Sequence, residues 1–325
     1  MRGSRATVGL FCVLVTGCTV GEIVSTGIGG RSGGKTGTGG ARGVGGASGV
    51  GGETGAGGMT GVGGASGVGG ASGVGGASGI GGASGAGGAV AASSTGTIVP
   101  LYTGPGDASW TAIAVAKKAH PTVPVIAIAN PSNGPGGSVD AQYTTGVRAL
   151  QGTGILVIGY VATGYTARGI SAVEADIDRW SSFYPFLQGI FFDEQSNRPG
   201  DEAFYRTVSQ YAKSLDLTLT VGNPGMDTAP TYFGVVDVDL IYESLGVPGD
   251  SSLAGWHTSY PRQSFGIIPY GVATFDPAYV KRVKPYVGYI YLTDDSLPNP
   301  WDSLPPYFDD LLAALEDAST VTAAR

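Results

Sequence analysis

Eight short runs of apolar, mostly β-branched residues follow one another after residue 96, and stretches of helical composition separate them. Several runs are apolar at every position, as in Pro124-Val125-Ile126-Ala127-Ile128-Ala129. A strand buried on both faces is typical of a parallel sheet covered by helices. We therefore expect parallel strands at 97–102, 124–129, 155–162, 189–193, 217–222, 238–243, 264–271 and 287–293.

Helical patterns lie between these runs, and we expect helices at 108–119, 139–150, 170–183, 202–215 and 304–318. Ser171 and Glu174 have the spacing of a capping box for the third helix, and Trp180 closes its apolar stripe. Eight strand and connection units in about 225 residues predict one α/β domain, a (β/α)8 barrel of the TIM type. A doubly wound open sheet is the alternative.

The N-terminal segment 1–17 has the pattern of an export signal. Arg2 and Arg5 precede an apolar stretch at 6–15 that is too short to span a bilayer. Residues 14–18 read Leu-Val-Thr-Gly-Cys and resemble a bacterial lipobox, in which the chain is cut before the Cys and its thiol is lipidated. We expect a cell-surface or outer-membrane lipoprotein anchored only through Cys18. A plain secretory signal, and hence a secreted protein, is the alternative.

A glycine-rich segment follows at 18–92. Of the 59 glycines, 33 lie in positions 21–90, where the hexapeptide Gly-Val-Gly-Gly-Ala-Ser recurs. A β-solenoid of this period needs a large apolar residue in each coil, and apart from a single Met59 the largest here is an occasional Val or Ile. We therefore predict a flexible linker at 18–92, ahead of a folded domain at 93–325.

Charge and metal-ligand types limit the partners of that domain. Residues 91–325 contain 13 Lys and Arg against 23 Asp and Glu, which disfavours nucleic acid and favours a neutral or cationic ligand. Both cysteines, Cys12 and Cys18, precede the domain, and His120 and His257 have no second ligand at metal-binding spacing. We expect a monomer with no metal and no cofactor.

Acidic residues end two of the predicted strands. In a (β/α)8 barrel the chemistry gathers at the carboxyl ends of the strands, where Asp193 and Glu194 close the fourth strand and Glu243 closes the sixth. Two strands apart in a sheet, inward-leaning carboxyl groups come within about 5–9 Å, the spacing of a glycosidase pair. Strand alternation turns Asp193 and Glu194 to opposite faces, so one of them supports rather than reacts. The sequence does not decide which.

Crowded, buried acids suit glycoside hydrolysis, because burial and like charge keep one carboxyl protonated while another stays ionised. Aromatic rings and amides at the same strand ends can contact sugars, although barrel packing or turn chemistry explains each of them equally well. The candidate substrate-binding residues are Tyr102, Asn130, Tyr160, Tyr165, Asn223, Tyr270, Asp294 and Trp301.

Segments spread over residues 98–315 together resemble the spherulin 4 (spherulation-specific) family. They are 99–102, 130–136, 159–163 with Tyr165 and Arg168, 189–194, 223–225, Glu243 and 294–301. The resemblance implies a (β/α)8 barrel similar to glycoside hydrolase family 135, whose activity is endo-hydrolysis of α-1,4-linked N-acetylgalactosamine in the exopolysaccharide galactosaminogalactan. It also implies that the essential acids are Asp193, Glu194 and Glu243. The lipobox and the glycine-rich spacer depart from the family domain and leave a related amino-sugar polymer open as the substrate.

The expected function is an endo-acting glycoside hydrolase that cleaves an N-acetylgalactosamine-containing or related hexosamine exopolysaccharide of a biofilm matrix. In this hypothesis Asp193 is the nucleophile or orients a substrate acetamide, Glu243 is the general acid/base, and Glu194 sets their protonation. The alternative from another class is a non-catalytic polysaccharide-binding surface lipoprotein, an adhesin. A metal-dependent deacetylase is a third possibility, which the lack of paired His ligands disfavours.

Overall fold

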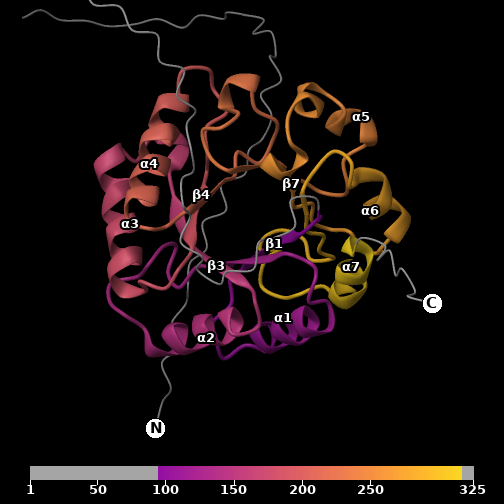
Figure 1. Cartoon of the computed structure of the whole chain (residues 1–325), viewed down its shortest axis with the longest axis horizontal. Helices are drawn as coiled ribbons and strands as arrows, with labels where there is room; N and C mark the ends of the chain where they lie inside the picture. The colour runs from indigo at the N-terminus through magenta and orange to yellow at the C-terminus, as the bar shows by residue number, and fades with distance from the viewer. Residues whose placement is uncertain (1–93, 317–325) are drawn as a thin grey trace, which may run out of the picture. The chain divides into compact units, whose positions relative to one another are not determined.

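The computed structural model describes residues 94–316, which form a ring of eight parallel strands in chain order (Figure 1). Gly96 pairs with Tyr289 and so joins the last strand to the first, which closes the barrel and excludes the open sheet. The strands are β1 (Thr97–Leu101), β2 (Val125–Ala129), β3 (Leu156–Ala162), β4 (Gly189–Asp193), β5 (Leu219–Gly222), β6 (Val238–Tyr242), β7 (Phe265–Ile267) and β8 (Tyr289–Ile290). All eight lie within the predicted runs, and β7 and β8 are the most shortened. The predicted signal peptide, Cys18 and the linker lie outside the described residues.

Helices surround the strand ring (Figure 1). They are α1 (Ala108–Ala119), α2 (Ala141–Gln151), α3 (Ile170–Phe183), α4 (Glu202–Ser214), α5 (Asp250–Leu253), α6 (Pro277–Val283) and α7 (Phe308–Leu315). The five predicted helices are confirmed, α1 and α3 at their predicted bounds, whereas α5 and α6 were not predicted. A single 3-10 turn, η2 (Pro230–Tyr232), replaces a helix between β5 and β6. Within residues 94–316, none of the helices has the length and apolar character needed to cross a membrane.

The helix starts show how local sequence sets the element bounds. Asp107 and Asp140 cap α1 and α2, since their carboxylates accept hydrogen bonds from backbone N–H groups of the first turn. The capping box predicted for α3 is wrong. A cap at Ser171 would start the helix at residue 172, whereas α3 begins at Ile170, with Gly169 as its N-cap and no side-chain cap, so Ser171 already lies inside the helix.

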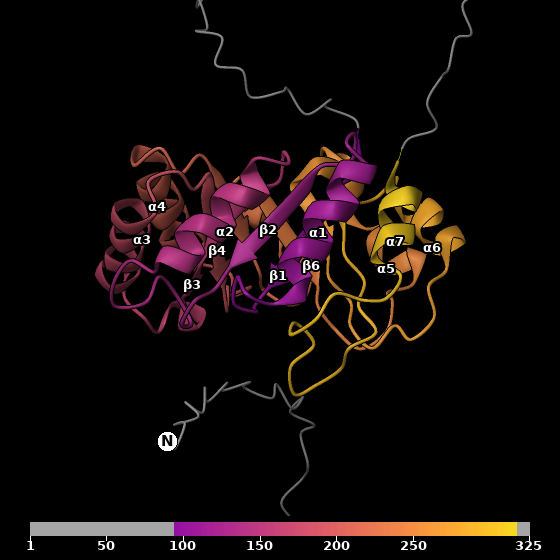
Figure 2. The same cartoon turned by 90° about the horizontal axis from the view of Figure 1, so that it is seen from below.

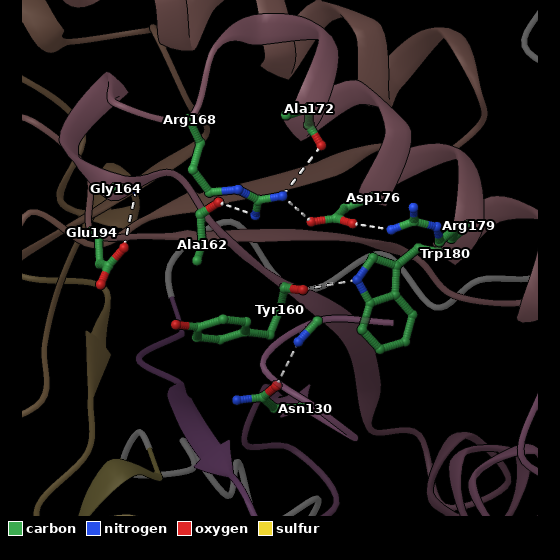
Figure 3. Close-up of polar contacts among 11 residues, drawn as sticks. Asn130, Tyr160, Ala162, Gly164, Arg168, Ala172, Asp176, Arg179, Trp180 and Glu194 are labelled. Carbon is green, nitrogen blue, oxygen red and sulfur yellow. Dashed lines mark hydrogen bonds and ion pairs between the residues drawn. The ribbon is translucent and has the colours of Figure 1, made fainter. Parts of the chain in front are cut away.

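One glycine fixes the wall of the barrel beside the site. A Cβ on Gly159 of β3 would lie 2.5 Å from the Trp180 ring, so only glycine allows α3 to pack this closely. The Trp180 indole then donates a 2.8 Å hydrogen bond to the carbonyl of Tyr160 (Figure 3). Because successive side chains on a strand point to opposite faces, the Tyr160 ring lies inside the barrel.

The carboxyl ends of the strands form what we call the mouth of the barrel. The connection between β8 and α7, in yellow, projects beyond the strands at this end (Figure 2). Most of the site residues described below lie at the mouth, either at the ends of the strands or on the segments that follow them.

Candidate active site

Asp193, the last residue of β4, is held through both carboxylate oxygens. Its Oδ2 accepts a 2.7 Å hydrogen bond from the Tyr160 hydroxyl, and its Oδ1 accepts a 2.9 Å hydrogen bond from the Asn223 amide. Burial raises the pKa of Asp193, while these two donors and the backbone N–H of Glu194 lower it. The side chain is thus fixed in position by partners that favour its charged form.

Glu243 follows β6 and shares the same donor. Its Oε2 accepts a 2.6 Å hydrogen bond from Nδ2 of Asn223, the nitrogen that also binds Asp193. Because that nitrogen lies 2.9 Å from one oxygen and 2.6 Å from the other, the two carboxylate oxygens can be no farther apart than these two hydrogen bonds placed end to end. The predicted meeting of the acids from β4 and β6 is therefore what the structure shows.

The two acids differ in how strongly their surroundings favour the protonated form. Burial, and next the charge of Asp193, raise the pKa of Glu243 to about 7, against opposing hydrogen bonds from Asn223 and Trp301. Asp193 has more donors, and like charges this close do not both ionise readily. We therefore assign the proton of the pair to Glu243 and the negative charge to Asp193.

A β-bulge in β6 turns Glu243 into the mouth. The pairing of β6 with β7 shifts register between Leu240 and Tyr242, so one extra residue is inserted there. Asp239, before the bulge, lies on the outer side of the wall beside Gly222, whereas Glu243, after it, lies inside. In a regular strand these two side chains would share one face, so the bulge re-aims the acid.

Glu194 does not follow the strand alternation that the sequence implied. Its backbone is left-handed, with φ of 53°, and its Oε2 accepts a 3.0 Å hydrogen bond from the N–H of Gly164 (Figure 3). Burial and the charge of Asp193 raise the pKa of Glu194, while Gly164 and the Arg168 charge lower it. The carboxylate thus rests on the segment after β3.

Several predicted aromatic residues gather around the acids. Tyr102 packs edge-on against Tyr160, with ring centroids 5.6 Å apart, and Asp193 and Glu243 both raise the pKa of Tyr102 after burial. Trp301 is buried, lowers the pKa of Glu243 through a side-chain hydrogen bond and packs against Tyr270. Tyr165 remains 42% exposed. These rings surround a pair of carboxyls.

Three predicted polar residues use their contacts elsewhere. The side-chain oxygen of Asn130 accepts a 2.9 Å hydrogen bond from the backbone N–H of Gly134 and so stabilises the loop after β2 (Figure 3). Both N–H groups of Asn223 point to carboxylates rather than to open space. The charge of Asp294 raises the pKa of Tyr291 and of Tyr307. Direct substrate contact by these three stays a prediction.

Asp239, on the outer side of the wall, is a further buried carboxyl that the sequence did not predict. Its Oδ1 accepts a 2.8 Å hydrogen bond from the Gln195 amide, and both side chains are nearly fully buried. Burial raises the pKa of Asp239 to about 7, against the Gln195 hydrogen bond. A single acid inside the apolar run 238–242 is the signal that could have revealed it.

In residues 94–316 the structure arranges no group of three or more His, Cys, Asp or Glu side chains where they could hold a metal ion. The site instead has two adjacent carboxyls that accept hydrogen bonds from one fixed donor, and we assign the proton of the pair to Glu243. Such a pair can protonate a leaving oxygen while stabilising positive charge on the adjacent carbon.

Comparisons with known proteins agree with this description. A family model described as spherulation-specific family 4 matches residues 96–315. Spherulin-4 of Physarum polycephalum is 37% identical over 169 residues, which are 51% of this chain and 50% of that protein. The chain thus spans about half the length of this relative. The crystal structure of Aspergillus clavatus Sph3 in complex with GalNAc superposes with a TM-score of 0.62 at 24% identity, over 68% of this chain and 97% of Sph3.

Proposed function

The chain belongs to the spherulation-specific family 4, and from this membership and the geometry of Asp193 and Glu243 we propose that it is an endo-acting glycoside hydrolase. The proposed substrate is an exopolysaccharide that contains N-acetylgalactosamine or a related hexosamine. The observation that carries the proposal is the single Asn223 nitrogen that binds both carboxyls.

Each acid has a role that follows from its charge state. The protonated Glu243 gives its proton to the glycosidic oxygen as the bond from that oxygen to the anomeric carbon breaks. The Asp193 carboxylate attacks the anomeric carbon, or orients a substrate acetamide group that attacks it. Glu243, now ionised, then takes a proton from the water that releases the sugar.

The separation of the acids favours retention of the anomeric configuration. Retaining enzymes hold their carboxyls about 5–5.5 Å apart, whereas inverting enzymes leave about 6.5–9.5 Å for a water between them. The two hydrogen bonds from Asn223, at 2.9 and 2.6 Å, keep the nearest oxygens of Asp193 and Glu243 close together, which agrees better with the retaining than with the inverting spacing. This closeness also counts against the adhesin alternative, which needs no paired acids.

Two observations support an amino sugar as the substrate. Sph3, a structural neighbour, is described in complex with GalNAc. The domain is also acidic, with 23 acidic against 13 basic residues from position 91 onward, and an acidic surface attracts a partly deacetylated, cationic hexosamine polymer. Export and a lipid anchor at Cys18 would place the enzyme at a cell surface beside such a polymer. Incorporation of a labelled fatty acid that a Cys18→Ala variant abolishes tests that placement.

The test is a digestion of purified hexosamine polymers, followed by mass spectrometry of the products. The wild-type chain should release shortened oligosaccharides. Asp193→Asn should lower turnover by at least about a thousandfold with an unchanged circular dichroism spectrum. Asp310→Asn, at an exposed position of α7, is the matched control and should cleave like the wild type. Wild-type turnover in Asp193→Asn would remove this residue from the mechanism.

A further inference from the structure

The segment after β3 contains an unusual left-handed turn. Gly164, Tyr165 and Thr166 have φ of 59°, 54° and 76°. A side chain is strained in this region, and a β-branched residue such as Thr166 especially so. Backbone of this kind persists only where its surroundings hold it, and it clusters at functional sites. The question is which residue holds this turn.

Glu194 holds the turn through two of its groups. Its side-chain Oε2 accepts the N–H of Gly164 at 3.0 Å (Figure 3). Its backbone carbonyl accepts the N–H of Tyr165 at 2.8 Å. The Thr163 hydroxyl lies 2.7 Å from the same carbonyl oxygen. Glu194 itself is left-handed, and this conformation directs its carboxylate back toward the turn.

Two neighbours of Glu194 favour its carboxylate form, against the burial and the Asp193 charge that raise its pKa. A backbone N–H is a donor only, and a hydrogen bond from it favours the charged form of the acid. Arg168 lies near enough for its charge to lower the pKa of Glu194, and its own guanidinium is fixed by the Ala162 carbonyl and by Asp176 (Figure 3). Asp193 and Glu243, in contrast, both accept hydrogen bonds from the side-chain amide of Asn223.

The turn carries Tyr165 to the edge of the acid site. This side chain is 42% exposed, and burial and the charges of Glu194, Asp193 and Glu243 all raise its pKa. Its hydroxyl therefore lies within electrostatic reach of all three carboxyls. An exposed aromatic ring at this place offers an apolar face to a sugar ring bound over the acids.

We propose that Glu194 is a positioning residue whose carboxylate holds the left-handed turn Gly164–Thr166, and with it Tyr165, against the bound sugar. This proposal rests on the proposed function and assigns no proton transfer to Glu194. It resolves which member of the adjacent acid pair reacts: Asp193 does, and Glu194 acts through Tyr165.

The deciding comparison is Glu194→Gln against Glu194→Ala in the full chain. The Gln carbonyl oxygen can still accept the Gly164 N–H, whereas it can neither give nor take a proton as a general acid or base does. We expect Glu194→Gln to keep kcat/KM within about threefold, and Glu194→Ala to lose about tenfold or more, mainly through KM. Equal and large losses in kcat for both variants would overturn the proposal.

A double-mutant cycle tests whether Glu194 acts through Tyr165. Tyr165→Asn removes the ring with a residue that tolerates the left-handed backbone. It should raise KM about as much as Glu194→Ala, and the double variant should lose little more than either single one. Losses that multiply in the double variant would show that Glu194 acts independently and would contradict the proposal.

Hydrogen exchange of the Gly164 and Tyr165 amides gives a readout that needs no turnover. Exchange should be faster in Glu194→Ala than in the wild type and nearly unchanged in Glu194→Gln. If the wild type cleaves no hexosamine polymer, the proposed function is wrong. The exchange measurement then still tests whether Glu194 stabilises the turn. Equal protection in the wild type and Glu194→Ala would then overturn the assignment.

Discussion

Asp193 and Glu243 accept hydrogen bonds from one nitrogen, Nδ2 of Asn223, at 2.9 and 2.6 Å. The residue follows β5, which lies between the strands that carry the two acids. An amide nitrogen has two N–H groups, and here each is directed to one carboxyl. The amide therefore fixes the spacing of the acids and favours the charged form of both.

Removal of this amide should change the pH dependence of the enzyme. In Asn223→Ala the pKa of Glu243 should rise, because a donor that stabilises its carboxylate is lost. We expect the alkaline limb of kcat/KM to move to higher pH and kcat to fall about tenfold to a hundredfold, since the acids are no longer held together. Gln142→Ala, an exposed amide on α2, is the control. An unmoved alkaline limb in Asn223→Ala would contradict the role of the shared donor.

The protonated state of Glu243 predicts the pH profile of the wild type. A general acid with a pKa of about 7 loses its proton above that pH, so kcat/KM should fall up to tenfold per pH unit there. Glu243→Gln should lack this limb and lose about a hundredfold or more in rate. Initial rates of oligosaccharide release between pH 4 and 9 provide the measurement. A rate that stays constant up to pH 9 would argue against Glu243 as the acid.

The spacing of the acids predicts the stereochemistry of the product. Because the nearest oxygens of Asp193 and Glu243 are bridged by a single nitrogen, the acids are closer together than the spacing that inverting enzymes use to hold a water. Proton NMR during digestion should therefore show the anomer of the substrate linkage first, before mutarotation. If the opposite anomer appears first, the double-displacement route through Asp193 is wrong.

Much of this arrangement follows from sequence patterns. Buried runs on both faces indicated the parallel barrel, and an acid that closes an apolar run marked Asp193 and Glu243. The residues at these strand ends could be assigned to one site because a barrel brings the carboxyl ends of all its strands together. The sequence could not show how the acids share one donor, because that depends on the register of three strands.

Local backbone geometry limited the rest of the prediction. Alternation predicts opposite faces for Asp193 and Glu194, but the left-handed φ of Glu194 breaks that rule. The bulge in β6 likewise separates the faces of Asp239 and Glu243. No glycine or proline marks the left-handed residue Glu194 or the bulge in β6 in the sequence. The periodicity of apolar residues alone therefore could not reveal either feature.

Asp239 is a buried carboxyl that the proposed chemistry does not use. Its pKa is about 7 in the folded chain against 3.8 in the unfolded reference, so the folded chain binds the proton more tightly. The stabilisation from this proton is full below pH 3.8 and is lost as the pH rises through about 7, at up to roughly 1.4 kcal/mol per pH unit.

Asp239→Asn removes this titration while its amide oxygen can still accept the Gln195 hydrogen bond. The free energy of unfolding, from urea titrations at pH 5 and pH 8, should therefore fall less between the two pH values in the variant than in the wild type. The raised pKa values of Glu243 and Asp193 act in the same direction, so part of the pH dependence should remain. Asp310→Asn, at an exposed position, should match the wild type. An equal fall in Asp239→Asn and the wild type would mean that Asp239 is already ionised at pH 5, and that the Gln195 amide and its surroundings stabilise a buried charge.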